Sequence, residues 1–282
     1  MVRITTDSTC DLTKKQIEEN NLEVIPLIVT LGEKDFYDDG KEITEEKIFN
    51  FVKETKVLPK TAARSSEDYK DFFNQFVEKG DVVVHVSLGA NLSSCYQSAC
   101  MAAEEIGGEK VFVVDSMSLS TGVGLLVLEG IRLENQGLLG KEIYEQLKSL
   151  APKTQASFVV DKLDYLYKGG RCSKFSFSLG SLLKIKPRLQ LIDGSIVNTG
   201  KDMGTMKSVL KKYVDHELTK YPNMRKNICF VTHTQMDQEI VDFVIDYVKS
   251  KGIFDEVVES MAGSVITSHC GPGTLGILYL CD

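Results

Sequence analysis

The chain has 282 residues, which is long enough for a sizeable core and for two domains of ordinary size. Its 40 acidic and 33 basic residues give a formal net charge of −7, and this argues against nucleic-acid binding because neutralising phosphates requires clustered Lys and Arg. No apolar run approaches the roughly 20 residues that a membrane span needs, so we expect no stable membrane insertion.

The first half of the chain alternates predicted strands and helices. Residues 2–7 read as a strand rather than as a signal peptide, and Thr13 with Gln16 fits a capping box that opens a helix to about residue 20. The apolar run 22–31 predicts a second strand, and helices are expected over 44–55 and 66–79. A buried strand over 81–87, a helix over 93–106, a strand over 110–116 and two helices within 120–150 complete a parallel α/β layout.

The pattern restarts near residue 151, so we predict two α/β domains, 1–151 and 152–282. A strand at 157–160 and a helix through 162–170 come first. Residues 185–200 then read as two strands joined by a hairpin turn at Asp193-Gly194. Helices over 205–220 and 237–251 flank a strand at 227–234, and another strand is expected at 254–261.

Nucleotide, metal and redox sites receive no support from the sequence. GPGTLG at 271–276 matches G-x-G-x-x-G, but only six residues follow it and they resemble a strand, so the helix and the later acidic residue of a dinucleotide site are missing. The four histidines lack metal-ligand spacing, and the seven cysteines form no C-x-x-C pair. We therefore expect no metal and no cofactor, and free thiols in a reducing cytoplasm.

A serine hydrolase is the alternative function. Serines occur at several predicted strand-to-helix turns, namely Ser8, Ser87, Ser93 and Ser116, and His269 with Asp7 or Asp115 would complete a triad. No G-x-S-x-G elbow accompanies them. Without an elbow such serines are more often helix caps than nucleophiles, so a lipid-ester hydrolase acting through Ser93 and His269 is the second choice.

Polar side chains at the ends of predicted elements suggest an anion site. Thr61 and Ser93 lie near helix N-termini, where free backbone N–H groups attract negative charge. Two hydroxyls together with the imidazole of His269 suit a carboxylate held by hydrogen bonds. N-capping alone would also explain the threonine and the serine. Arg171 follows two glycines that could expose it to phosphate, or it is a surface arginine after a helix stop.

Six ordered motifs span nearly the whole chain, and with them the sequence resembles the DegV family. The motifs are TDSTCDL (6–12), PKTAARS (59–65), SLGANLSSCYQSA (87–99), LDYLYKGGRCS (163–173), LKIKPRLQLIDG (183–194) and SHCGPGTLG (268–276). The resemblance implies two α/β domains with a ligand tunnel at and between them that holds a long-chain fatty acid. It also implies a non-enzymatic, fatty-acid-binding subunit of a bacterial fatty acid kinase. Such a subunit presents the carboxylate to a separate ATP-binding kinase, which makes acyl-phosphate for phospholipid synthesis.

The same resemblance assigns roles to four residues. Thr61, Ser93 and His269 match the residues that hydrogen-bond the fatty acid carboxylate, and Arg171 matches an arginine associated with phosphoryl transfer and the kinase partner. The chain departs from the family pattern at six positions, which puts the pocket shape and the kinase contact in doubt: Ala62, Ala63 and Arg64 in place of Ser-Gln-Pro, Ser94 and Cys95 in place of Gly-Thr, and Met203 in place of an arginine.

Overall fold

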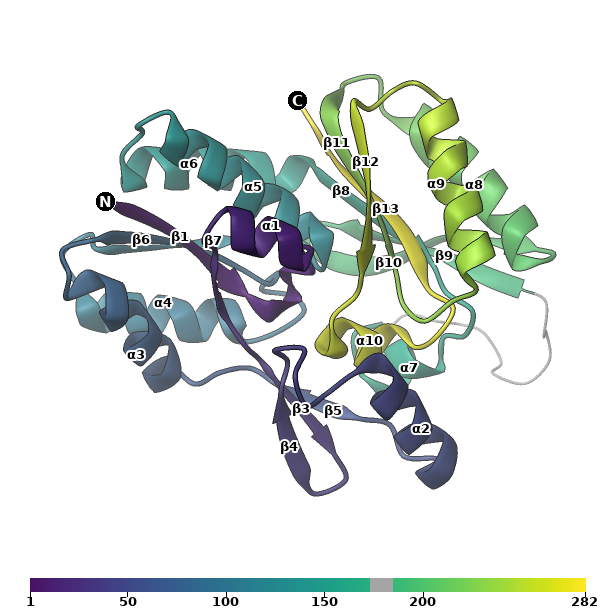
Figure 1. Cartoon of the computed structure of the whole chain (residues 1–282), viewed down its shortest axis with the longest axis horizontal. Coiled ribbons are helices and arrows are strands. Elements are labelled where there is room, and N and C mark those ends of the chain that lie inside the picture. Colours follow the sequence, from purple (N-terminus) through teal and green to yellow (C-terminus); the bar gives the residue numbers. More distant parts are fainter. Residues whose placement is uncertain (173–184) are drawn as a thin grey trace.

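The computed structural model describes residues 1–172 and 185–282, and it is built on three β-sheets (Figure 1). The first is an all-parallel sheet in the order β2 (Glu23–Ile25), β1 (Val2–Asp7), β6 (Val82–Ser87) and β7 (Val111–Asp115). Helices α3 (Ser66–Val77) and α4 (Cys95–Ile106) cover one face, and α5 (Thr121–Asn135) and α6 (Gly140–Leu150) cover the other. The α/β class predicted from the sequence is confirmed.

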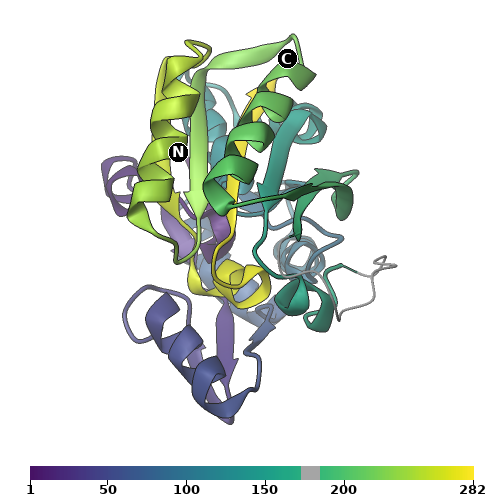
Figure 2. The same ribbon diagram turned by 90° about the vertical axis from the view of Figure 1, so that its right-hand side faces the viewer.

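The second sheet has six strands in the order β10 (Ser195–Met203), β9 (Ile185–Ile192), β8 (Thr154–Val159), β13 (Leu275–Cys281), β11 (Met224–His233) and β12 (Glu256–Met261). Its neighbours are antiparallel except β11 and β12. Figure 2 shows α8 (Met206–Lys220) and α9 (Gln238–Ser250) side by side on one face. Helix α5 packs against β8 and β13 of this sheet as well as β1 and β6 of the first. Ten of its 15 residues are buried and most of these are apolar, as expected for a helix between two sheets.

A third, three-stranded antiparallel sheet projects from the body of the molecule in Figures 1 and 2. It has the order β4 (Lys34–Tyr37), β3 (Ile28–Leu31) and β5 (Lys60–Ala62), and α2 (Glu45–Thr55) accompanies it. Between this sheet and the six-stranded one lie two short helices, α7 (Asp164–Lys168) and α10 (Ser264–Cys270). Helix α10 contacts β3, β5 and α2, although it lies more than 200 residues after them in the sequence.

Several sequence predictions are confirmed in detail. Thr13 and Gln16 form the predicted capping box at the start of α1 (Lys14–Glu19). Asp193 and Gly194 form the turn between β9 and β10, with φ values of 49° and 71°, which a two-residue type I′ hairpin requires. Two 3-10 turns, Ser8–Cys10 and Ala151–Lys153, follow β1 and α6. The division of domains at 151/152 remains a prediction.

The structure differs from the sequence predictions in three places. The run 22–31 is not one strand, because Pro26, which has no N–H to donate, separates β2 from β3 and the two strands join different sheets. Strands β4 and β5 were not predicted. Helix α10, which carries His269, was not predicted either.

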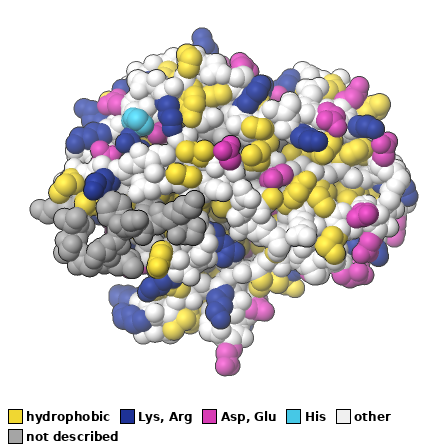
Figure 3. Space-filling view, turned by 180° about the vertical axis from the view of Figure 1, so that it is seen from behind, with side chains coloured by type: hydrophobic (Ala, Val, Ile, Leu, Met, Phe, Trp, Pro, Cys, Tyr) yellow, Lys and Arg dark blue, Asp and Glu magenta, His cyan; other side chains and the backbone are white. Residues whose placement is uncertain are grey.

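The surface shown in Figure 3 has Lys and Arg scattered among acidic and apolar side chains. In residues 1–172 and 185–282, no helix is both long and apolar enough to cross a bilayer.

Candidate functional site

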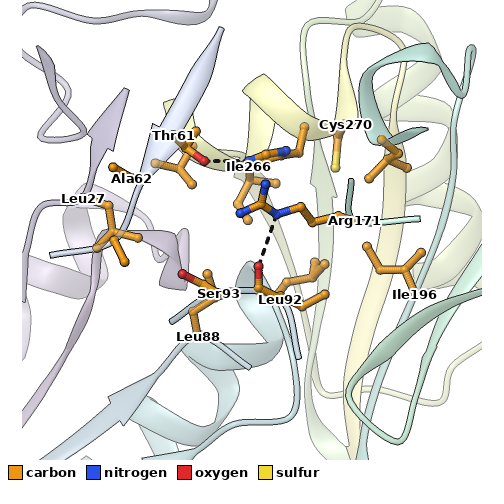
Figure 4. Close-up of a pocket in the computed structure, with 15 residues that line it drawn as sticks. Leu27, Thr61, Ala62, Leu88, Leu92, Ser93, Arg171, Ile196, Ile266 and Cys270 are labelled. Carbon is orange, nitrogen blue, oxygen red and sulfur yellow. Dashed lines mark hydrogen bonds between the residues drawn. The ribbon is translucent and has the colours of Figure 1, made fainter. Parts of the chain in front are cut away.

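The four residues singled out in the sequence line one narrow cavity of about 50 Å³. Thr61 comes from β5, Ser93 from the loop before α4, Arg171 from the turn after α7, and His269 from α10. Figure 4 shows Thr61, Ser93 and Arg171 around the cavity with apolar neighbours. The rest of the lining is almost entirely apolar: Leu27, Ala62, Ala63, Leu88, Leu92, Leu119, Leu166, Ile196, Val265, Ile266 and Cys270. A small apolar cavity with a few polar groups in its lining suits an apolar chain that carries a polar head.

Thr61 and His269 contact each other directly. The Thr61 hydroxyl oxygen lies 2.7 Å from His269 Nε2. Thr61 is paired in β5 opposite Val29, and Ser65 caps α3, so the N-capping explanation for Thr61 was wrong. Burial, together with the positive charge of Arg171, lowers the pKa of His269 to about 4. The imidazole is therefore neutral at pH 7.

Ser93 is fixed by the first turn of α4. Its hydroxyl oxygen accepts the backbone N–H of Cys95 at 3.3 Å and lies 3.1 Å from the Cys95 Sγ. Ser94 occupies the N-cap position without a side-chain hydrogen bond. In the described part of the chain no hydrogen bond joins Ser93 to His269, so the geometry lacks the nucleophile–base contact on which a hydrolase depends.

Arg171 folds back along the cavity instead of extending into solvent. The helix stop before it is of the Schellman type, since Arg171 donates its N–H to the Leu166 carbonyl and Gly170 has a φ of +74°. The guanidinium donates to the carbonyls of Leu92 at 3.2 Å and Gly169 at 2.7 Å. Leu92, Ser93 and Arg171 also line an outer groove of about 660 Å³, so the groove and the cavity share these residues.

A second cavity of about 30 Å³ lies next to the first one. Leu119, Ile266 and Cys270 line both, and the second cavity reaches the six-stranded sheet at Phe158 and Leu278. Polar side chains at its margin are bonded within the protein. For example, the Thr121 and Thr232 hydroxyls are 2.6 Å apart, and Thr234 donates to the Gly271 carbonyl at 2.7 Å. The two cavities are therefore adjacent, with three lining residues in common.

Sequence reasoning missed the residues that hold α10. Asp11 accepts a hydrogen bond from the Gly263 N–H at 2.9 Å and from the Ser120 hydroxyl at 2.5 Å. Asp38 accepts the N–H of Ser264, the first residue of α10, at 2.8 Å. Asp11 belongs to the motif TDSTCDL, which carried the family resemblance without a role of its own. Nothing in the local sequence around Asp38 marks it as a contact of α10.

Three of the six departures from the family pattern line the cavity or the outer groove. Ala62 and Ala63 line it, whereas Arg64 turns away and pairs with Asp68 at 2.8 Å. The Cys95 sulfur contacts the Ser93 hydroxyl, and Ser94 lines the outer groove. Met203 is exposed at the end of β10. The described residues contain no group of three potential metal ligands.

Comparison with known proteins gives a consistent result. The family model "Uncharacterised protein, DegV family" matches residues 1–282. The chain is 31% identical over 285 residues to a fatty acid-binding protein of Thermotoga maritima, covering 98% of this chain and 96% of that one. A DegV domain-containing protein of Clostridium perfringens is 28% identical over 279 residues, with 99% and 98% covered.

Solved structures agree. A fatty-acid-binding DegV family protein from Thermus thermophilus superposes with a TM-score of 0.91 at 30% identity, covering 100% of this chain and 99% of that one. A stearic acid-binding protein from Eubacterium ventriosum gives a TM-score of 0.84 at 29% identity, with 100% and 98% covered.

Proposed function

The chain belongs to the DegV family, and from that premise we propose that it binds a long-chain fatty acid whose carboxylate is held by Thr61, Ser93 and His269. One observation carries the proposal: side chains from both halves of the chain bring two hydroxyls and a neutral imidazole to the lining of the same, otherwise apolar, cavity. Relatives of similar length are described as binding fatty acids, and one is described as binding stearic acid.

The acyl chain would run past Leu119, Ile266 and Cys270 into the second cavity. Burial of an acyl chain contributes about 0.8 kcal/mol per CH₂, so most of the affinity would come from the tail. The polar end then needs only to orient and desolvate the carboxylate. Neutral hydrogen-bond donors suffice for that task, and no metal or other cofactor is required.

We further propose that the protein is not itself an enzyme, and that in the cytoplasm it presents the carboxylate to a separate ATP-binding fatty acid kinase. The acyl-phosphate formed would serve phospholipid synthesis. Arg171 supports this part of the proposal, because it lines both the cavity and the outer groove. A phosphate approaching through this groove would meet a guanidinium, which binds phosphate oxygens well.

The binding proposal is tested by denaturing mass spectrometry of the purified full-length protein and by titration of delipidated protein with fatty acid. We expect bound or acquired fatty acid with wild type and much weaker uptake with Thr61→Val. Thr30→Val is the matched control, because Thr30 lies on the neighbouring strand β3 of the same sheet and bonds Asp35 instead. Failure of wild type to bind any fatty acid would refute the proposal, and labelling of Ser93 by a fluorophosphonate would favour a hydrolase.

A further inference from the structure

His233 lies at the end of β11, and both of its ring nitrogens face oxygen atoms. Nδ1 lies 2.9 Å from the backbone carbonyl oxygen of Thr234, and Nε2 lies 3.2 Å from a carboxylate oxygen of Glu259 on β12. A carbonyl oxygen can only accept a hydrogen bond, so Nδ1 carries a hydrogen. The Glu259 oxygen already accepts the side-chain N–H of Gln238 on α9 at 3.1 Å, so it is an acceptor for Nε2 as well. The geometry therefore assigns a hydrogen to both nitrogens, and His233 is an imidazolium.

The surroundings of His233 favour this positive charge. Its side chain is 2% exposed, and two carboxylates face it, Glu259 on β12 and Glu45 on α2. Burial raises the pKa of Glu45, whereas a hydrogen bond from α10 and the charge of His233 lower it. The adjacent strands place apolar residues opposite His233, namely Met261 of β12 and Leu275 of β13. The charge of the imidazolium is therefore compensated by carboxylates from two other elements.

The segment that begins at His233 holds the chain on both sides of α10. The His233 carbonyl accepts the N–H of Ala262 at 2.9 Å, just before the helix. The Thr234 hydroxyl donates to the Gly271 carbonyl at 2.7 Å, just after the helix. Because Nδ1 of His233 also bonds the Thr234 carbonyl, the imidazolium fixes the conformation of the two residues that hold α10.

Helix α10 is in turn a wall of both cavities. Ile266 and Cys270 line the first cavity and the second, and Val265 and His269 add to the first. His233 itself lines the second cavity. A ligand in either cavity therefore lies against a helix whose two ends depend on His233.

We propose, resting on the fatty-acid-binding function above, that His233 is a pH-sensitive positioning residue for α10. As an imidazolium it links Thr234 to Glu259 and keeps α10 against the ligand. Loss of either ring hydrogen leaves a nitrogen lone pair facing an oxygen lone pair, so this link weakens. An imidazole ordinarily changes charge between about pH 5 and 8. The link is present at the acidic end of that range and lost at the basic end, so bound fatty acid leaves faster as pH rises.

NMR of the full-length protein tests the charge of His233 without any ligand. In protein with ¹⁵N-labelled histidine at about pH 6, we expect both ring nitrogens of His233 to carry a hydrogen. The signals are assigned by their loss in His233→Gln. A His233 ring with only one protonated nitrogen at this pH would overturn the inference.

Release of radiolabelled hexadecanoic acid from the full-length protein to excess albumin provides the second test. We expect wild type to release it about 10-fold faster near pH 8.5 than near pH 6, the scale of one hydrogen bond to a charged group. His269 stays neutral over this range, because burial and the charge of Arg171 lower its pKa to about 4. An ordinary carboxyl group, with a pKa of about 4, is ionised throughout. A release rate that does not change with pH would refute the proposal.

Variants assign the pH dependence to one histidine. His233→Gln and His233→Asn cannot take up the charge, so we expect both to release fatty acid at all pH values about as fast as wild type does near pH 8.5. His216→Gln is the matched control, because His216 is 48% exposed on α8 and should leave the wild-type dependence intact. A pH dependence that persists in both His233 variants would overturn the proposal and assign it to another group, such as Asp11. A wild-type protein that takes up no fatty acid would count against the proposed function instead, and the NMR result would still decide the charge of His233.

Discussion

Asp38 accepts the backbone N–H of Ser264 at 2.8 Å, so a carboxylate from the first half of the chain caps the helix that carries His269. Asp11 accepts the N–H of Gly263, the residue before it. A helix of seven residues is not stable in isolation. The orientation of His269 therefore depends on contacts made across more than 200 residues of sequence.

Replacing Asp38 by alanine should loosen this helix. The substitution leaves the Ser264 N–H and the Ser8 hydroxyl, which donates to Asp38 at 2.9 Å, without their acceptor. We expect the free energy of unfolding to fall by about 1–3 kcal/mol and fatty acid affinity to fall with it. Asp38→Asn keeps one acceptor oxygen and serves as the control. Urea unfolding and ligand titration of both variants give the comparison, and an alanine variant as stable as wild type would contradict the capping role.

The pH dependence of stability should carry the signature of Asp11. Burial raises the pKa of Asp11 well above its usual range, the hydrogen bonds from Ser120 and Gly263 oppose that shift, and the neighbouring Asp38 adds to it. Because the folded pKa exceeds the unfolded value of about 3.9, the folded state holds the proton more tightly. The contribution of Asp11 is therefore most favourable at low pH and declines as pH rises through the raised pKa.

Asp11→Asn removes that titration. The difference in unfolding free energy between wild type and the variant should shift in favour of the variant as pH rises from about 4 towards neutrality. Urea denaturation at a series of pH values measures the difference, which cancels the other carboxylates common to both proteins. A constant difference across this range would show that Asp11 does not titrate abnormally.

The sequence singled out the four polar residues that line the cavity, because each lies in one of the six motifs: Thr61, Ser93, Arg171 and His269. Spacing alone could not have done so, since 208 residues separate Thr61 from its hydrogen-bond partner His269. The helix and strand pattern was predictable wherever elements are long and amphipathic, as in α2, α3 and α9.

The unpredicted elements are short and depend on tertiary contacts. Strands β4 and β5 have four and three residues. Helix α10 contains the β-branched residues Val265, Ile266 and Thr267, which disfavour a helix in isolation, and its caps come from Asp11 and Asp38. A local pattern holds no information about a cap that lies 226 residues away.

The contact between Gly169 and His269 can be tested by a matched pair of alanine variants. A Cβ on Gly169 would meet Nδ1 of His269 at 2.6 Å, and the backbone there is ordinary, with φ of −72°. Gly170→Ala meets nothing within 4 Å but has φ of +74°, so it should cost only stability, by about 1 kcal/mol. We expect fatty acid affinity to fall in Gly169→Ala and to stay near wild type in Gly170→Ala. The reverse order would mean that the His269 ring is not confined by Gly169.

Arg171→Ala should separate binding from presentation. In the proposed function the acyl tail supplies most of the affinity, so we expect fatty acid binding by the variant to change little. We expect phosphorylation of the bound fatty acid by an ATP-dependent kinase to be abolished. Lys168→Ala, an exposed residue of α7, controls for the loss of one positive charge. Titration and a radiolabelled phosphate-transfer assay give the two readouts, and a collapse of binding would show that Arg171 instead grips the carboxylate.

The route of the acyl tail can be tested at Leu119, which lines both cavities and is nearly buried. Leu119→Trp should fill the passage between them. In wild type each additional CH₂ should strengthen binding by about 0.8 kcal/mol until the second cavity is full. In the variant this gain should stop at a shorter chain, because the tail can no longer pass the bulkier side chain.

Affinities for saturated fatty acids of increasing length provide the measurement. Leu139→Trp is the control, because Leu139 is 69% exposed, precedes α6 and lines neither cavity. A plot of binding free energy against chain length should bend earlier for Leu119→Trp and coincide with wild type for Leu139→Trp. If the plots for wild type and the two variants were parallel, the tail would not pass Leu119, because a blocked route must weaken the binding of long chains more than that of short ones.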